Sequence, residues 1–287
     1  MKRSSAKHNQ TGFTLVELIL VIVLLGIIGA GSAHFIRSAS DVYVDVTERE
    51  ALLRNASFAV ERFTRELASA VPNSVRVSGN TSVHCLEFVP IKWNAYYLSL
   101  PSVSGSSAQV DIVQMADIDG NPYVPSGSDM AIVYPLQASH VYNASENRRQ
   151  AITACTDDGQ GDCSLADDPD HVVQLTVSDG FPLSSPTRRL YIADSSISYC
   201  LRGQQLYRHT SSINSTQTLY TSGGQLMAQG LQNVLSSNPQ ATPGALDPFR
   251  VVDATLTRNG FTRANFLFAR SDEQISIVKE VHIPNVP

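Results

Sequence analysis

The chain has 287 residues, a formal net charge of −5 and a charged fraction of 16%. This length holds one large domain or two modest ones, with enough interior for a substantial core. A net negative chain lacks the basic footprint of nucleic-acid-binding proteins, so we expect no nucleic acid as a partner.

The N-terminal stretch combines a basic leader with a long apolar segment. The leader, residues 1–12, contains three basic residues and no acidic one, and the only charged side chain from Phe13 to Phe35 is Glu17. About 20 apolar residues suffice to cross a membrane, and the positive-inside rule keeps the leader in the cytoplasm. We therefore expect residues 13–35 to span the inner membrane once, with the C-terminal region in the periplasm.

Glu17 is the unusual residue of this apolar segment. A carboxylate in lipid costs about 2.5–3.5 kcal/mol and is tolerated when an opposite charge pairs with it. A secretory signal cleaved near Gly31-Ser32-Ala33 and a plain uncleaved anchor are two alternatives. The apolar core of a secretory signal is shorter, about 7–15 residues, and neither alternative explains Glu17.

The segment Gly12-Phe13-Thr14-Leu15-Val16-Glu17 resembles the type III signal of type IV prepilins and type II secretion pseudopilins. The resemblance implies that a prepilin peptidase cleaves after Gly12 and methylates the new amino terminus on Phe13. It also implies that Glu17 neutralises the N-terminal amine of a neighbouring subunit during filament assembly.

An amphipathic stretch follows the apolar segment. Apolar residues recur at steps of three and four: Leu52, Ala56, Ala59, Val60, Phe63, Leu67, Ala70 and Val71. This periodicity predicts a helix with one buried face. Pro72 ends it, because the residue before a proline is pushed out of the α region. We expect one N-terminal helix over residues 13–71, with Ser38–Asp41 as a candidate joint.

From Asn73 onward the pattern changes to short alternating segments separated by turn-forming residues, which predicts strands. The predicted strands are Val83–Val89, Ala95–Leu100, Val110–Met115, Met130–Tyr134, Val172–Val177, Arg189–Ala193 and Gln274–Ile283. A hairpin is predicted from Phe249 to Arg258, with a turn on Asn259-Gly260 and a return through Phe261–Ala269, because Asn-Gly is a strong hairpin signal. Residues 72–287 thus form one β-rich head. The whole is the α+β, type IV pilin-like fold that the resemblance implies.

Ile197–Leu201 and Leu206–Arg208 predict paired strands with a turn near Arg202-Gly203. These strands resemble the heads of larger minor pilins, MSHA-type and PilW-type subunits among them, and of J-type pseudopilins. The resemblance implies a minor type IV pilin. The large size of the head suggests a low-copy position at the tip or in the initiating complex of a pilus, because its bulk would crowd a repeating shaft. Its partners would be the prepilin peptidase, other minor and major pilins, and the inner-membrane assembly platform. The subunit would move from the inner membrane to the pilus at the cell surface.

Three other interpretations stay open. One is a J-type minor pseudopilin of a type II secretion system, which would share the N-terminal motif. Another is a signal-anchored periplasmic enzyme, although the sequence contains no nucleophile elbow, zinc-protease motif or phosphate loop and we expect no enzymatic activity. A third is an adhesin whose aromatic residues Trp93, Tyr96 and Tyr97 bind a glycan.

Four cysteines lie in the predicted periplasmic region, where disulfides form and persist. Four cysteines allow three pairings. Cys155 and Cys163 flank a short polar loop that is easily closed, which favours Cys155–Cys163 together with Cys85–Cys200. No pair has the spacing of a zinc knuckle.

Two acidic segments have the hard oxygen ligands that Ca²⁺ prefers. Asp117–Asn121 looks like half a calcium loop, but it lacks the downstream glutamate. Asp157, Asp158 and Asp162 lie in the loop between two cysteines. A solvated acidic loop is the simpler interpretation of both segments, so we expect no cofactor and keep Ca²⁺ at Asp157, Asp158 and Asp162 as the alternative.

Overall fold

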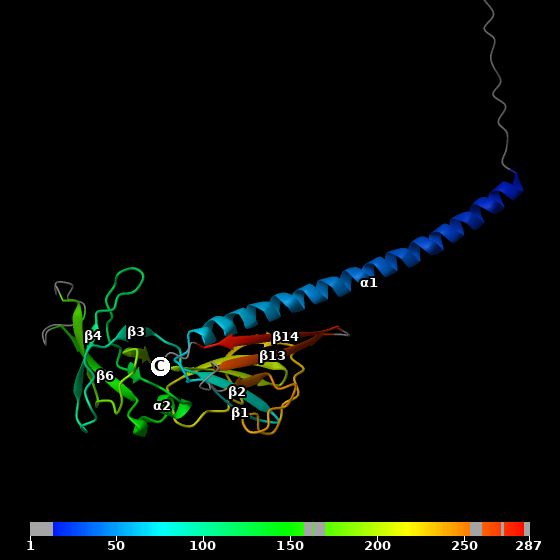
Figure 1. The fold of residues 1–287 in the computed structure, drawn as a ribbon. Coiled ribbons are helices and arrows are strands. Elements are labelled where there is room, and N and C mark those ends of the chain that lie inside the picture. The colour runs from blue at the N-terminus through cyan, green and yellow to red at the C-terminus, as the bar shows by residue number, and fades with distance from the viewer. Residues whose placement is uncertain (1–13, 158–162, 164–169, 253–259, 271–272, 284–287) are drawn as a thin grey trace, which may run out of the picture. The chain divides into compact units, whose positions relative to one another are not determined.

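The computed structural model describes residues 14–157, 163, 170–252, 260–270 and 273–283. The chain divides into two compact units, Met1–Leu53 and Arg54–Pro287. Helix α1 (Leu15–Ala68) contributes residues to both units, and the strands, drawn as arrows in Figure 1, all belong to the second. A long N-terminal helix followed by a β-rich globular region confirms the predicted α+β fold.

The head is built from antiparallel sheets. Its strands are β1 (Arg76–Asn80), β2 (Val83–Phe88), β3 (Trp93–Tyr96), β4 (Ala108–Val113), β5 (Met130–Val133), β6 (Arg149–Thr156), β7 (Val172–Val177), β8 (Arg189–Ala193), β9 (Ser196–Arg202), β10 (Gln205–Ser211), β11 (Gln225–Gln229), β12 (Phe249–Val252), β13 (Phe261–Arg270) and β14 (Glu273–His282). Between β5 and β6 lie two short helices, α2 (Ala138–Tyr142) and η1 (Ala144–Glu146). The three sheets have the strand orders β1-β2-β9-β10-β11, β12-β13-β14 and β3-β8-β5-β6-β7-β4.

Helix α1 is continuous over its whole length, including the candidate joint at Ser38–Asp41. The sequence predicts its end at Val71, whereas the structure ends it at Ala68. The reason is a tertiary contact: the backbone N–H of Val71 donates to the carbonyl of Val89 at 2.8 Å, so this segment joins the chain that follows β2.

The buried face of α1 is the predicted one. Within the helix, five residues of the predicted apolar stripe are buried: Ala56, Ala59, Val60, Phe63 and Leu67; Ala70 and Val71, just beyond its end, are buried too. The side chain of Leu52 lies outside the described part of the chain. An amphipathic helix gains most of its stability from packing such a face against a core, so this half of α1 belongs to the folded head.

Phe63 is the central contact of this face. Its ring meets Tyr199 of β9 edge-on, with ring centroids 5.1 Å apart, and contacts Phe266 of β13 at 5.7 Å and Phe249 of β12 at 5.9 Å. Each such aromatic pair contributes about 0.5–1.5 kcal/mol beyond the burial of its surface. The helix is therefore packed against strands of two sheets at once.

Glu66, one turn after Phe63, adds a polar attachment. Its carboxylate accepts hydrogen bonds from Arg208 Nε at 2.8 Å, from the Tyr199 hydroxyl at 2.9 Å and from Arg62 Nε at 2.9 Å. Burial by itself raises the pKa of Glu66, but these hydrogen bonds outweigh it and lower the pKa below the ordinary value of 4.5. The carboxylate is thus held ionised between the helix and strands β9 and β10.

Several predicted strands have the observed bounds or nearly so. β7 and β8 match the prediction at both ends, and β9 and β10 form the expected hairpin around Gly203. Strands β1, β6 and β11 have no counterpart in the prediction. β6 follows the αL residue Asn147 and shifts register against β7 between Ile152 and Ala154, so its alternation is irregular.

The predicted C-terminal hairpin exists, but its register is different. The sequence predicts that Phe261 pairs with Arg258 across a two-residue Asn259-Gly260 turn. In the structure Phe261 pairs with Val252, so residues 253–260 connect β12 to β13. This register places Phe249 beside Ala264 and brings the rings of Phe249 and Phe266 within 5.8 Å. Packing against Phe63 therefore overrides the local turn signal. Residues 253–259 lie outside the described part.

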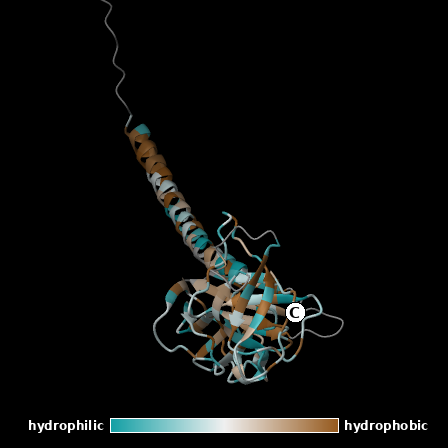
Figure 2. Ribbon diagram, turned by 90° about the vertical axis from the view of Figure 1, so that its left-hand side faces the viewer, coloured by the Kyte–Doolittle hydropathy of each residue, from teal (hydrophilic) through white to brown (hydrophobic). Residues whose placement is uncertain are grey.

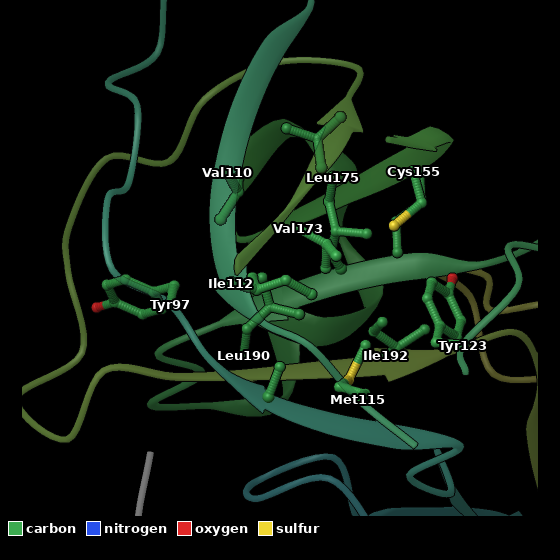
Figure 3. Close-up of a cluster of buried hydrophobic side chains, with 14 of the residues drawn as sticks. Tyr97, Val110, Ile112, Met115, Tyr123, Cys155, Val173, Leu175, Leu190 and Ile192 are labelled. Carbon is green, nitrogen blue, oxygen red and sulfur yellow. The ribbon is translucent and has the colours of Figure 1, made fainter. Parts of the chain in front are cut away.

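The six-stranded sheet closes on itself. Tyr97, just after β3, forms a bridge with Ile112 of β4, and the next N–H, of Leu98, donates to the Asp111 carbonyl at 2.8 Å. Apolar side chains from these strands fill the interior, as Figure 3 shows for Val110, Ile112, Leu175 and Leu190 among others. Inward and outward residues alternate along β7. The result is a small barrel with its own core.

The barrel is an insertion between two neighbouring strands. The chain leaves β2 at Phe88 and returns at Ser196 to start β9, and β2 and β9 are paired directly. Cys85 and Cys200 lie opposite each other in this pair and form a disulfide, with Cα atoms 4.1 Å apart. The bond ties together the two strands from which the barrel emerges.

Asp129 holds one long connection of the barrel in place. Its buried carboxylate accepts hydrogen bonds from Lys92 Nζ at 2.6 Å, from the Tyr123 hydroxyl at 2.7 Å and from the Ser126 backbone at 2.9 Å. Burial by itself raises the pKa of Asp129, and the bonds from Lys92 and Ser126 lower it by more. The segment between β4 and β5 is therefore anchored to the start of β3.

The helix attachment is testable at Glu66. Replacing Glu66 by Ala leaves Arg208 and the Tyr199 hydroxyl without their acceptor, so we expect a loss of about 1–3 kcal/mol in the free energy of unfolding. The matched control is Glu61→Ala on the same helix, because Glu61 is exposed and its pair with Arg65 is 3.6 Å long. Such an exposed pair contributes about 0–1 kcal/mol. Urea unfolding of the full chain in detergent measures both, and equal losses would refute the attachment.

The same residue predicts a pH dependence. Because the pKa of Glu66 is lowered on folding, its stabilisation is complete above the ordinary value of 4.5 and is lost as the pH falls through the lowered value. The stability difference between the wild type and the Glu66→Ala variant should therefore narrow below pH 4.5.

The two disulfides should differ in their effect on stability. Cys85 and Cys200 are 115 residues apart in sequence, whereas Cys155 and Cys163 are 8 apart. Closing about 100 residues contributes roughly 4.7 kcal/mol in the chain-entropy account and a loop of about 15 residues roughly 3. We expect the double alanine variant at 85 and 200 to unfold at a lower urea concentration than the one at 155 and 163. The reverse order would contradict this account.

Candidate functional site

The N-terminus of α1 is capped by its own sequence. The Thr14 side-chain oxygen accepts the backbone N–H of Glu17 at 3.3 Å, and the Thr14 carbonyl accepts the N–H of Leu18 at 3.2 Å. Threonine followed three residues later by glutamate is the capping-box pattern. Glu17 therefore lies in the first turn, where the helix dipole favours a negative charge.

The surface of α1 around Glu17 is apolar on all sides. Its large hydrophobic residues from Leu15 to Ile36 are all exposed. An 18-residue window has a mean hydropathy of 2.5 with no part buried, and α1 is the one helix in the described part that is long and apolar enough to cross a membrane. Figure 2 shows this stretch in brown, giving way to teal along the helix. From Phe13 to Ile36, Glu17 is the only charged residue of the sequence.

The predicted processing residues lie at the edge of what the structure describes. Gly12 and Phe13 are outside the described residues, so cleavage and methylation stay predictions. Glu17 is described, and its side chain is exposed at the start of the apolar segment. Its predicted pairing with another subunit's amine also stays a prediction.

The cysteines pair as the sequence favours, Cys85 with Cys200 and Cys155 with Cys163. Of the candidate calcium ligands, Asp158 and Asp162 lie outside the described residues, while Asp157 is described and buried. Within the described ranges no three His, Cys, Asp or Glu side chains gather in a metal-binding arrangement. The calcium site at these aspartates therefore stays an untested alternative.

In the other acidic segment, Asp117–Asn121, the carboxylate oxygens of Asp117 accept hydrogen bonds from residues of the same segment. Asp117 accepts hydrogen bonds from the side chain of Asn121 at 3.0 Å, from its backbone N–H at 2.8 Å and from the N–H of Asp119 at 2.9 Å. The bond from the Asn121 side chain is the largest cause that lowers the pKa of Asp117. The carboxylate thus closes a turn at the tip of this loop.

The three aromatic residues of the adhesin alternative do not share a surface. Tyr97 is buried in the barrel, where its hydroxyl donates to the Ser185 carbonyl at 3.1 Å. Trp93 packs edge-on against Tyr123, with centroids 5.5 Å apart. Tyr96 is the exposed member, at 51%. The three side chains therefore do not form a common surface on which a glycan could stack.

One polar cluster is found only in the structure: His84 of β2, with Ser236 and Asp247 from the segment between β11 and β12. The Ser236 hydroxyl donates to Asp247 Oδ2 at 2.6 Å, and His84 Nε2 contacts the Ser236 carbonyl at 2.9 Å. The hydroxyl of Ser236 is therefore bonded to Asp247 and not to His84, and His84 is fully buried. This is not the nucleophile–base arrangement of a hydrolase. No local motif connects these residues, which are far apart in sequence.

Residues 7–33 match the family model of the prokaryotic N-terminal methylation motif. No curated protein and no solved structure was found to match the chain. The methylation motif implies processing by a prepilin peptidase, association with a membrane and assembly with other pilins. Together with the capped apolar helix and the β-rich head, it supports a protein of the type IV pilin-like superfamily, a pilin or a pseudopilin.

Proposed function

We propose that the chain is a minor type IV pilin of an MSHA-type pilus, most like MshO, which works by assembly and not by catalysis. The observation that supports this most directly is the methylation motif at residues 7–33 on a helix whose apolar surface contains a single carboxylate, Glu17. In this proposal the prepilin peptidase cleaves after Gly12 and methylates Phe13. The helix holds the subunit in the inner membrane, with the head in the periplasm.

Glu17 would guide assembly through its charge. An ionised carboxylate among aliphatic side chains is tolerated only when an opposite charge pairs with it. The new amine at Phe13 of a neighbouring subunit supplies that charge as the apolar helices pack together. The capping box at Thr14 supports this role, because it keeps Glu17 in the first helical turn beside the processed terminus.

The head supports a low-copy position, at the tip or in the initiating complex. Between β2 and β9 the chain inserts a complete barrel, which enlarges the head beyond the sheets that contact α1. A subunit of this bulk suits a site where few copies are needed. Its partners would be other minor and major pilins and the inner-membrane assembly platform.

A J-type pseudopilin of a type II secretion system is the second candidate, since the same motif and helix serve both systems. Deleting the gene in its own host separates them. Loss of surface pili with normal exoprotein secretion supports the pilin. Loss of exoprotein secretion with normal pili supports the pseudopilin.

Processing is tested by the mass of the mature N-terminus. We expect the protein purified from membranes to begin at Phe13 with one added methyl group, and the Gly12→Val variant to retain its leader. The matched control is Gly31→Val, which removes a small residue from the alternative cleavage region and should leave processing unchanged. A chain that begins after residue 33, or an unprocessed one in the presence of the peptidase, would reject the proposal.

The role of Glu17 is tested by its isosteric replacement. Glu17→Gln keeps the shape of the side chain and removes its charge, so we expect normal membrane insertion and cleavage with defective assembly. Losing one partner of a buried ion pair costs about 3–5 kcal/mol, which predicts at least about tenfold fewer filaments by electron microscopy. His34→Ala, in the same apolar segment, is the control. Normal filament numbers with Glu17→Gln would remove the charge-pairing mechanism.

A further inference from the structure

A buried histidine and a buried carboxylate connect β2 to the 233–247 loop, the segment that follows β11 and precedes β12. His84 Nδ1 lies 3.6 Å from Asp247 Oδ1, and the two side chains are 0% and 1% exposed. On the other side of the imidazole ring, Nε2 is 2.9 Å from the Ser236 carbonyl. The proposed assembly mechanism, which uses Glu17 and the amine of Phe13, does not involve His84 or Asp247.

The geometry specifies where the protons are. A carbonyl oxygen only accepts, so His84 Nε2 must bear a hydrogen to bond to Ser236. The buried Nδ1 has no hydrogen-bond partner among the described residues, and it lies 3.6 Å from Asp247 Oδ1. Without a hydrogen on Nδ1, its lone pair would face a carboxylate oxygen, which is electrostatically unfavourable. With a hydrogen on both nitrogens, the ring is an imidazolium that pairs with Asp247.

The hydrogen bonds of Asp247 favour the ionised form of its carboxyl group. Oδ1 accepts the N–H of Ser236 at 2.8 Å, and Oδ2 accepts the N–H of Gly244 and the Ser236 hydroxyl, both at 2.6 Å. All of these groups donate, which is the environment of an ionised carboxylate. A buried carboxylate without a counter-charge is strongly destabilising, and His84 is the cation that the structure places beside it.

In the described part of the chain, the register partners of His84 on the two neighbouring strands are uncharged. Gly79 of β1 and Leu201 of β9 are its register partners, and a Cβ at Gly79 would lie 2.4 Å from the imidazole ring. Glu87, further along β2, pairs with Arg76 at 2.7 Å. The charge on the ring is therefore set by Asp247.

We propose that His84 and Asp247 form a proton-operated latch that holds the 233–247 loop against β2. While the imidazolium is present, the loop is closed. Loss of its proton leaves the Asp247 carboxylate buried without a counter-charge, and the loop is released.

Release would alter two features of the head. The start of the loop forms one wall of a cavity of about 350 Å³, whose other walls are the β1–β2 and β9–β10 turns; its lining includes Ser82, Gly203, Gln204, Asn233 and Val234. Asp247 also lies two residues before Phe249, whose ring packs on Phe63 of α1. The loop that the latch holds therefore lines the cavity at its start and leads, at its end, to the strand whose Phe249 contacts the helix.

The direct test is ¹⁵N NMR of the histidine side chains in the full chain, labelled at histidine and held in detergent. Free histidine loses its proton near pH 6.5. From this geometry we expect both nitrogens of His84 to be protonated at about pH 7, and the His84→Gln variant assigns the signal. A neutral His84 ring at about pH 7, with Nδ1 bare, would overturn the proposal.

Hydrogen exchange tests the release of the loop. Between about pH 6 and pH 8.5 we expect protection factors in the 233–247 loop of the wild type to fall at least about tenfold. Asp247→Asn, a neutral isostere, should remove this pH dependence, and His171→Gln, at an exposed histidine, should preserve it. A loop equally protected at both pH values in the wild type would refute the latch. Should His84→Gln fail to fold, the wild-type titration and Asp247→Asn still decide the question.

Discussion

The contact of Phe63 and Glu66 with the head is the interaction on which the rest of the structure depends. The first part of α1 is apolar on all sides, whereas its last part has one buried face. One turn of the amphipathic half supplies both an aromatic ring for Tyr199, Phe249 and Phe266 and a carboxylate for Arg208. A single helix thereby serves two environments, because the character of its surface changes along its length.

The apolar segment of α1, the two sheets that contact Phe63 and the barrel each have a different role in the molecule. The segment around Glu17 has the composition needed in a membrane and the capping that keeps its one charge at the helix terminus. The sheets β1-β2-β9-β10-β11 and β12-β13-β14 provide the strands that meet Phe63. The barrel is built between β2 and β9 with a core of its own, so it adds surface to the head without changing the helix attachment.

The Cys85–Cys200 bond and the His84–Asp247 pair lie close together along β2. The disulfide crosslinks β2 to β9 at the base of the barrel, and the adjacent residue His84 contacts the 233–247 loop. One strand is thus linked covalently on one side and by an ion pair on the other. The first link is a covalent bond that persists in an oxidising environment, whereas the second is a contact between two buried side chains.

The sequence by itself determined the features that depend on near neighbours. Periodicity predicted the buried stripe of α1, alternation predicted β7 and β8, and the segment from Gly12 to Glu17 indicated the pilin-like class. Only the tertiary structure decided that α1 stops at Ala68, that Phe261 pairs with Val252, and that His84 lies beside Asp247. Each of these follows from contacts between residues distant in sequence. The energy of such contacts depends on which strands become neighbours. The local propensity of a segment does not specify those neighbours.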